Sequence, residues 1–339
     1  MKETRKPFVS IILPVHNSGE YLRKCLDTLV NQTMRKIEII CVVDKPTDGS
    51  DLIVEEFRKC DTRIKVITNE TNQNIAESRN IGLRIARGEY IGFSDHDDWR
   101  KLNMYEELYN KAKKEDADIV TSNSCVNVNG YRNIYKYNCL TKEGIISSII
   151  LPLWSRSNPN TLSKSVWASI YRRNFLSLNG IKFMDKRIIH EEDTLFNLKA
   201  FLNVSRVAHI DMNYYYWKIH ENSTSQQPIP NMISRQINLY ISIKDILYEN
   251  KVLNKYEKEL GILISTNSIL DIQTYLKCSR KEYQKFSVFT FYLRRNLVDR
   301  TIVESISKKK LILFYLLKAL LVIHYLSSFF KFRKQQFDD

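Results

Sequence analysis

The first hundred residues alternate between short apolar runs and amphipathic stretches, and this alternation leaves few folds open to the chain. The apolar runs have the length of strands and cover residues 8–15, 37–43, 64–68 and 90–94. Between them, apolar residues recur at the i, i+3, i+4, i+7 spacing of a helix face, as from Glu20 to Asn31. Strand–helix alternation of this kind builds a parallel, doubly wound sheet, so the predicted fold class is α/β.

Polar residues follow three of these predicted strands. His16 and Asn17 follow the first strand, Asp44 the second, and Asp95 with Asp97 the fourth. Ligands of doubly wound sheets bind outside the carboxyl ends of the strands. Mg²⁺ is commonly held by one or two protein carboxylates together with phosphate oxygens and water. The polar residues at these strand ends therefore predict a site for a metal ion and a phosphate-bearing ligand. The alternative is that the acidic residues form a turn that caps the next helix.

After Trp99 the pattern changes. A second set of elements is predicted: a helix at 102–115, strands at 118–128 and 131–137 around an Asn-Gly turn, a strand at 166–171, a helix opening at 190–193, strands at 207–210 and 214–220, and helices from about 231 onward. Boundaries near residues 100 and 228 are expected from this change. The sequence thus predicts an α/β region followed by a helical C-terminal extension.

Several classes of protein are disfavoured by what the sequence lacks. Neither G-x-x-x-x-G-K nor G-x-G-x-x-G occurs, so P-loop and dinucleotide sites have no support. The six cysteines form no C-x-x-C pair, which argues against a zinc ribbon and fits a reducing cytoplasm. The apolar run at 8–15 is short, contains Pro14 and is followed by no small-residue cleavage site, so it is not expected to direct export.

Basic charge is concentrated near the C-terminus of a chain whose net charge is +14. From Lys277 to Lys310 there are ten Lys or Arg against three Asp or Glu, and the apolar stretch 311–330 follows. A central Lys318 makes a full membrane span unfavourable by roughly 2.5–3.5 kcal/mol. We therefore expect residues 308–334 to lie on an anionic membrane surface; a terminal helix packed on the protein is the alternative. A nucleic-acid partner is not expected, because the positive net charge is the only feature of the sequence that supports one.

Six segments, in order and at sensible spacing, resemble the motifs of a known enzyme family. They are Ser10–Asn17, Glu38–Ser50, Asn74–Tyr90, Phe93–Trp99, Glu191–Phe196 and Tyr214–Ser225. Together they resemble a family 2 glycosyltransferase of the bacterial surface-polysaccharide type, with the GT-A fold, a Rossmann-like, doubly wound, mostly parallel sheet. The resemblance implies a nucleotide-sugar-binding half at 1–100, an acceptor-binding half with the catalytic base at 101–228, and a helical region at 229–339.

The activity that the resemblance implies is an inverting transfer of a hexosyl or N-acetylhexosaminyl group. The donor would be a UDP-sugar, and the acceptor a hydroxyl of a glycan or of a polyprenyl- or other lipid-linked intermediate. A divalent metal ion, Mn²⁺ or Mg²⁺, would neutralise the diphosphate leaving group. The expected location is cytoplasmic, peripheral at the inner face of the cell membrane. Neither the sugar, the linkage nor the oligomeric state is predicted.

Roles for single residues follow from the same resemblance. Asp95 and Asp97 would hold the metal ion, and Asp193, with Glu192 beside it, would take the proton of the acceptor hydroxyl. The residues expected to bind the nucleotide-sugar are Pro14, Val15, His16, Asn17, Asp44, Arg79, Asp95, His96, Lys218 and His220.

Asp44 would accept the N3–H of uracil, and three cations of that set, Arg79, Lys218 and His220, would bind the diphosphate late in the reaction. Each of these cations is alternatively a structural or surface charge. Glu192 and Asp193 are alternatively acidic residues that favour a helix N-terminus.

The chain departs from the family pattern in two places. The Asp-Asp-Gly-Ser turn keeps only its second Asp, Asp44, and Pro46 stiffens a turn that is normally flexible. Lys218 stands where Arg is commoner, and Lys lacks the bidentate fork of Arg. Two other functions stay open: a sugar nucleotidyltransferase, which would need a basic triphosphate loop that is absent, and a catalytically degenerate nucleotide-sugar-binding protein.

Overall fold

A computed structural model describes residues 6–128, 131–135, 140–152, 164–218 and 232–275. The chain divides into two compact units. The first comprises Met1–Ile149 with Leu153–Ser242, and the second comprises Ile150–Pro152 with Ile243–Asp339. The candidate site residues that the structure describes all belong to the first unit. The predicted boundaries at residues 100 and 228 rest on motifs and stay a prediction.

Four parallel strands form one end of a single sheet, which confirms the α/β fold class. They are β1 (Val9–Val15), β2 (Ile37–Val43), β3 (Ile64–Thr68) and β4 (Tyr90–Phe93), in the order β3-β2-β1-β4. Every residue of β1 and β2 is buried. This is why these strands read as unbroken apolar runs rather than alternating ones.

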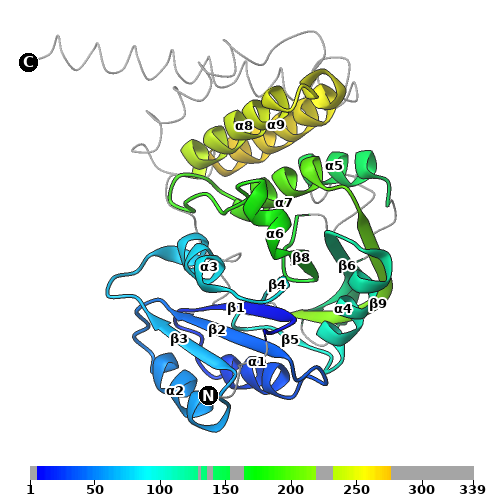
Figure 1. The fold of residues 1–339 in the computed structure, drawn as a ribbon. Coiled ribbons are helices and arrows are strands. Elements are labelled where there is room, and N and C mark those ends of the chain that lie inside the picture. The colour runs from blue at the N-terminus through cyan, green and yellow to red at the C-terminus, as the bar shows by residue number, and fades with distance from the viewer. Residues whose placement is uncertain (1–5, 129–130, 136–139, 153–163, 219–231, 276–339) are drawn as a thin grey trace, which may run out of the picture. The chain divides into compact units, whose positions relative to one another are not determined.

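The helices that connect these strands lie on both faces of the sheet. In Figure 1, α1 (Tyr21–Val30) and α2 (Ser50–Cys60) lie on one face and α3 (Asn74–Ile85) on the other. The change of face accompanies the reversal of strand order at β1, which has β2 on one side and β4 on the other. Such a reversal is the usual ligand site of an open α/β sheet.

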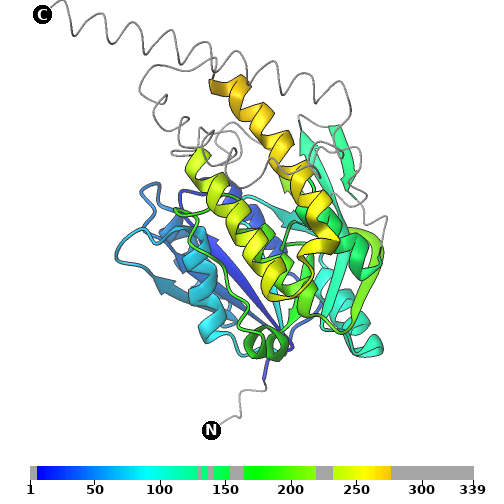
Figure 2. The same cartoon turned by 90° about the horizontal axis from the view of Figure 1, so that it is seen from above.

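Helix α3 approaches the sheet closely, over the parallel strands (Figure 2). Gly82 makes this possible, because a Cβ at that position would collide with the side chain of Ile12. The N-terminus of α3 lies at the carboxyl ends of β1 and β2, because the N–H of Asn74 donates to Asp44 and Asn72 contacts His16.

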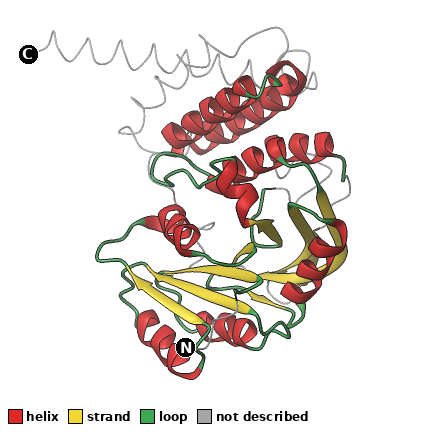
Figure 3. Cartoon of the chain, viewed as in Figure 1, coloured by secondary structure: helices red, strands yellow, loops and turns green. Residues whose placement is uncertain are grey.

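The other end of the sheet is mixed, and its strands stand at a steep angle to β1–β3 (Figure 3). Strand β8 (Ser169–Arg172) is antiparallel to β4 and to β6 (Ile119–Val128), and β9 (Val207–Lys218) is parallel to β6. The short β5 (Trp99–Arg100) closes that edge against β9, and β7 (Tyr131–Tyr135) pairs with β6 as the expected hairpin.

The prediction of two separate strands at 207–210 and 214–220 is wrong: the described part is one strand, β9. Its register against β6 shifts at Ser122–Ser124, where β9 contains extra residues. The exposed Asp211 and Met212 lie in this irregularity. They interrupt the apolar pattern without ending the strand, as β-bulges do.

Four further helices cover the mixed part: α4 (Met104–Glu115), α5 (Lys142–Ile150), α6 (Arg173–Leu178) and α7 (Glu192–Asn203). Helix α7 buries Leu195, Phe196, Leu198 and Phe201, as its periodicity predicts. Phe196 stacks on Phe183 with ring centroids 4.3 Å apart, and both rings meet Phe93 edge-on. This aromatic core ties α7 to the end of β4.

The predicted C-terminal helices are present as α8 (Met232–Glu249), which crosses the boundary between the units, and α9 (Leu253–Tyr275). Lys251 joins them in the left-handed conformation, with φ of 58°. Within the part of the chain that the structure describes, no helix is long and apolar enough to cross a membrane. The predicted membrane-surface segment 308–334 lies outside the described residues.

Candidate active site

The acidic motif after β4 is anchored by its last carboxylate. Asp98 is fully buried; its Oδ1 accepts the backbone N–H of Lys218 at 2.9 Å, and its Oδ2 accepts the Tyr215 hydroxyl at 2.7 Å. The same hydroxyl accepts the backbone N–H of Asp95 at 3.1 Å. Burial raises the pKa of Asp98 well above its usual range, and Asp97 and Asp95 raise it further. Asp98 therefore joins the motif to β9 and leaves Asp95 and Asp97 on the more open side.

The buried side chain of Arg100 also contacts the acidic motif. Arg100 Nη2 donates to Ser94 Oγ at 2.7 Å and to the backbone carbonyl of Asp98 at 3.2 Å. Its Nη1 reaches the carbonyl of Cys25 on α1 at 3.2 Å. By donating to these neutral acceptors, Arg100 holds the loop between β4 and β5 against α1.

A second buried arginine links the acidic motif to α7. Arg79 lies on α3 with its side chain 2% exposed. Nη2 donates to Asp95 Oδ1 at 2.8 Å, and Nη1 donates to Asp193 Oδ1 at 2.5 Å and lies 3.4 Å from Glu192 Oε1. The two carboxylates predicted to bind the metal ion and to act as base, Asp95 and Asp193, thus share one guanidinium.

Asp193 has the electrostatic properties of a proton acceptor. Burial raises the pKa of Asp193 to about 7; Glu192 and Asp95 act in the same direction, and Arg79 opposes them. The side chain still exposes 23% of its surface, whereas Glu192 exposes 7%. A carboxylate with this pKa that a substrate can reach suits general base catalysis near neutral pH.

The start of α7 is held by the residue before it. Glu191 adopts φ of 62°, in the left-handed region that costs a non-glycine residue about 1–2 kcal/mol. Its Oε2 accepts Lys164 Nζ at 2.9 Å and Thr194 Oγ1 at 3.0 Å. Burial opposes the ionisation of Glu191, but Lys164 and His190 outweigh it and lower the pKa of Glu191 to about 2.

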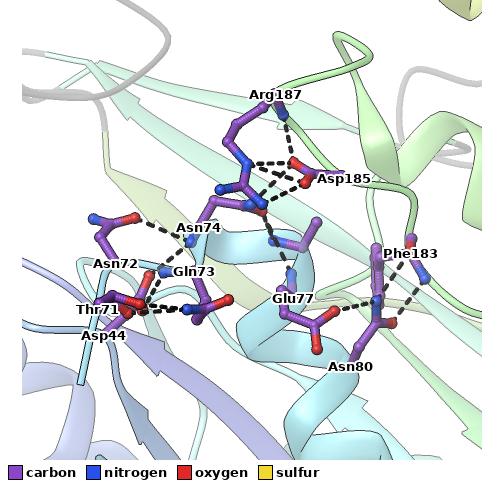
Figure 4. Close-up of polar contacts among 11 residues, drawn as sticks. Asp44, Thr71, Asn72, Gln73, Asn74, Glu77, Asn80, Phe183, Asp185 and Arg187 are labelled. Atoms are coloured by element: carbon purple, nitrogen blue, oxygen red, sulfur yellow. Dashed lines mark hydrogen bonds and ion pairs between the residues drawn. The ribbon is translucent and has the colours of Figure 1, made fainter. Parts of the chain in front are cut away.

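Asp44, at the end of β2, organises the loop that leads into α3 (Figure 4). Its Oδ1 accepts the backbone N–H of Gln73 at 2.7 Å and Asn69 Nδ2 at 2.8 Å, and its Oδ2 accepts the N–H of Asn74 at 2.9 Å. The side chain is thus surrounded by neutral donors, and a carboxylate offers about four acceptor positions in all.

Asn74 continues this network toward the segment that precedes α7 (Figure 4). It has φ of 72°, and its Oδ1 accepts the N–H of Ala76 at 3.0 Å, as expected for a helix cap. Its Nδ2 donates to Asp185 Oδ1 at 3.0 Å, and Arg187 Nη2 donates to Asp185 Oδ2 at 2.5 Å. The Asp44 loop and the 185–187 segment are therefore connected through one side chain.

The remaining predicted residues are distributed over the end of β1, the acidic motif and the Tyr21 ring. Pro14 and Val15 are buried at the end of β1; His16 Nδ1 lies 2.7 Å from the carbonyl oxygen of Asp44, and Asn17 Oδ1 accepts the N–H of Thr47 at 2.7 Å. By contrast, Lys218 Nζ lies 3.8 Å from the centre of the Tyr21 ring. His96 is half-buried in the acidic motif, and His220 lies outside the described residues.

Contacts thus join several of the predicted residues into two groups, one around Asp44 and one around Arg79, while the Lys218 ammonium lies over the Tyr21 ring. Sequence reasoning missed the contribution of Tyr215, Asp185 and Lys164 to these groups. A left-handed Asn74 was readable as a cap, but its second partner was not, because Asp185 is distant in sequence. For Tyr215 the only available signal was its position in the closing motif.

A metal ion would have few protein ligands here. Among the residues that the structure describes, no group of three or more His, Cys, Asp and Glu side chains is placed to hold one. Asp95 and Asp97 supply hard carboxylate oxygens at a half-buried position. Because Mg²⁺ and similar ions take one or two carboxylates and complete their shell with phosphate and water, the pair fits an ion that arrives with a diphosphate.

Comparison with known proteins gives consistent matches. The family described as "Glycosyl transferase family 2" matches residues 10–175. A "Putative glycosyltransferase EpsH" of Bacillus subtilis is 31% identical over 288 residues, which are 82% of this chain and 81% of that protein. The "Poly(ribitol-phosphate) beta-glucosyltransferase" of Bacillus spizizenii is 32% identical over 61% of this chain and 32% of its own length.

Among solved structures, residues 1–349 of S. aureus TarS in complex with UDP-GlcNAc align with a TM-score of 0.68 at 22% identity. The alignment covers 96% of this chain and 92% of that one. At this level of identity the likeness concerns the fold alone.

Proposed function

Since this chain belongs to glycosyl transferase family 2 and is a glycosyltransferase, we propose that it transfers a sugar from a UDP-sugar to an acceptor in cell-surface polysaccharide synthesis. The observation that carries this proposal is the meeting of Asp95 and Asp193 at the Arg79 guanidinium, beside the Asp44 loop. TarS, which shares the fold, has been crystallised with UDP-GlcNAc, and the related B. spizizenii enzyme acts on poly(ribitol phosphate).

The donor would lie along the carboxyl ends of β1, β2 and β4. Asp44 uses three acceptor positions for Gln73, Asn69 and Asn74, which leaves one on Oδ2 for the N3–H of a uracil ring. Pro14 to Asn17 would contact the nucleotide from β1. Uracil is favoured over cytosine because cytosine N3 is an acceptor and would face a carboxylate.

Asp95 and Asp97 would hold a divalent ion, Mn²⁺ or Mg²⁺. When bound, such an ion neutralises charge on the departing diphosphate. His96 lies between these two residues in the sequence and would contact the nucleotide-sugar. Lys218 and His220 are the cations proposed to contact the diphosphate after transfer. The Asp98–Tyr215 and Tyr215–Asp95 hydrogen bonds would keep this loop in place when the donor binds.

Asp193 would act as the general base. Its carboxylate takes the proton of the acceptor hydroxyl while the hydroxyl oxygen bonds to the anomeric carbon of the sugar. The bond from that carbon to the diphosphate oxygen breaks on the opposite side, and UDP leaves with the electron pair, so the configuration inverts. Glu192, the less exposed neighbour, raises the pKa of Asp193 and so strengthens the base.

The proposed setting is the cytoplasmic face of the membrane, with residues 308–334 on the anionic surface and a lipid-linked or polymeric glycan as acceptor. Domain roles follow the division at residues 100 and 228. Membrane fractionation tests the setting: a chain truncated after Ser307 should leave the membrane fraction. If it partitions like the full chain, the surface segment is not the anchor.

The donor is tested by a screen of UDP-sugars against the corresponding GDP- and CMP-sugars. Each is incubated with the full chain and Mn²⁺ or Mg²⁺, and hydrolysis and calorimetric binding are measured. We expect UDP itself to bind and at least one UDP-sugar to be hydrolysed slowly in a metal-dependent way. Binding of another nucleotide without binding of UDP would refute the role of Asp44.

A further inference from the structure

Both Nη groups of the Arg79 guanidinium are bonded to carboxylates. Its two Nη atoms contact Asp95, Asp193 and Glu192. Its Nε is buried and has no hydrogen-bond acceptor among the described residues. The ring of Phe183 lies over the guanidinium, with 5.1 Å between its centre and Cζ. With 2% of its side chain exposed, Arg79 has little surface to offer a diphosphate.

The helix that carries Arg79 also holds the segment leading to Asp193 at two other points. Asn80 and Phe183 form a reciprocal pair, in which Asn80 Nδ2 donates to the Phe183 carbonyl at 3.0 Å and Phe183 N–H donates to Asn80 Oδ1 at 2.9 Å (Figure 4). Asn74 Nδ2 holds Asp185 by a single hydrogen bond to Oδ1 at 3.0 Å. Because α3 is itself seated tightly on β1 at Gly82, these contacts locate the segment relative to the sheet.

We propose that Arg79 is a positioning residue, which holds the base Asp193 at a fixed place relative to the metal-binding carboxylate Asp95. This inference rests on the proposed roles of those two carboxylates and replaces the expected role of Arg79 as a diphosphate ligand. Asp95 follows β4, Asp193 lies in the first turn of α7, and Arg79 hydrogen-bonds to both.

The choice of arginine follows from this geometry. Guanidinium is planar and presents its two Nη groups in a rigid fork, so bonding Asp95 through one fixes the direction of Asp193 through the other. A lysine at the same place supplies the charge without the fork. Its ammonium would hold the carboxylates together but would let the angle between them vary. A displacement of a catalytic group by about 1 Å can reduce the rate by about 100-fold.

The test compares Arg79→Lys with the wild type in the full chain. With the UDP-sugar found active in the screen, we expect kcat for transfer to fall by about 100-fold while the Kd for UDP with Mn²⁺, measured by calorimetry, changes by less than about threefold. Arg23→Lys is the matched control, because Arg23 forms an exposed bidentate pair with Glu56 on the surface. Its kcat and Kd should equal those of the wild type.

Two outcomes would overturn the inference. One is a loss of UDP affinity as large as the loss of kcat, which would make Arg79 a diphosphate ligand. The other is a kcat within about threefold of the wild type, which would leave the fork without a function. If the wild type itself transfers from no UDP-sugar, the proposed donor fails and the inference is tested with the donor that does react.

A second pair of variants guards against misfolding. Arg79→Lys keeps the positive charge that Asp95 and Glu192 face, so it should be tolerated in an Asp193→Asn background. If Arg79 acts through Asp193, adding Arg79→Lys to Asp193→Asn changes the residual rate by less than about threefold. A further fall by the full ~100-fold would mean that Arg79 acts independently of the base.

Discussion

Asp44 and Asp193 are both carboxylates at the edge of the same fold, but their surroundings are opposite. Asp44 is 2% exposed and accepts only neutral amide donors, two of them from the backbone. Asp193 is more exposed and faces two cations, Arg79 and Lys186, and two other carboxylates. In the first arrangement the carboxylate holds the loop around it through hydrogen bonds. In the second, burial and the neighbouring carboxylates raise the pKa of Asp193, so in the proposed mechanism Asp44 holds the donor and Asp193 takes part in the reaction.

Removing the carboxylate charge at the reactive side should give the largest effect. Asp193→Asn keeps the size of the side chain but cannot take a proton, so transfer should fall by roughly 10²–10⁴-fold while UDP binding is retained. Steady-state transfer and calorimetry measure the two quantities. The control is Asp51→Asn, at an exposed acidic position in the first turn of α2. Transfer by the Asp193 variant at the wild-type rate would rule out its role as base.

At the holding side the expected effect is on stability. Asp44→Ala leaves the N–H groups of Gln73 and Asn74 without their acceptor. Both residues are half-buried, so each unpaired N–H should cost about 1–2 kcal/mol, the lower part of the range for buried groups. The free energy of unfolding from urea titration should fall by about 2–4 kcal/mol, with weaker UDP binding. Asp193→Asn should show no such loss. Equal destabilisation by both substitutions would remove the distinction between the two sites.

The pH dependence sharpens the same contrast. The pKa of Asp193 is raised to about 7, so transfer should rise with pH as this carboxyl loses its proton, and level off above neutrality. Stability should move the other way. Between the ordinary pKa of 3.8 and about 7, the folded chain keeps a proton that the unfolded chain has lost, so this group contributes less to stability as pH rises.

The measurement is a pH profile of kcat and of the unfolding free energy for the wild type and Asp193→Asn. The difference in stability between the two proteins should change across that window. A wild-type rate that is independent of pH from 5 to 8 would contradict the assignment.

The smallest effect is expected at Asn74, which connects the two sites. Asn74→Ala removes the cap on Ala76 and the bond to Asp185 and keeps an unfavourable φ, so it should cost about 1–2 kcal/mol. Asn74→Gly loses the same bonds but adopts φ of 72° freely, and should cost less. Thermal unfolding of both variants gives the order. If glycine is the more damaging, the backbone conformation is not what asparagine provides here.

The parallel strands and the polar residues at their carboxyl ends could be predicted, because both depend on the local sequence pattern. Buried strands such as Val9–Val15 are continuous apolar runs, and Asp44 follows one of them directly. The contacts of Arg79 could not be predicted, since its carboxylate partners on α7 lie over a hundred residues away and meet it only after α3 and α7 pack. The continuity of β9 was missed because a bulge places Asp211 and Met212 in solvent, which resembles a loop.

That bulge has a consequence for how the length of this chain can vary. Tyr215 meets both the Asp95 amide and the Asp98 carboxylate only while it points inward. Along a strand, one added residue turns every following side chain to the other face. A single insertion directly beside Tyr215 would therefore break both contacts at once, whereas the irregular stretch already holds extra residues at Asp211, Met212 and Tyr214. Length changes in β9 should be tolerated at Asp211 and Met212 and excluded from Tyr215 to Lys218.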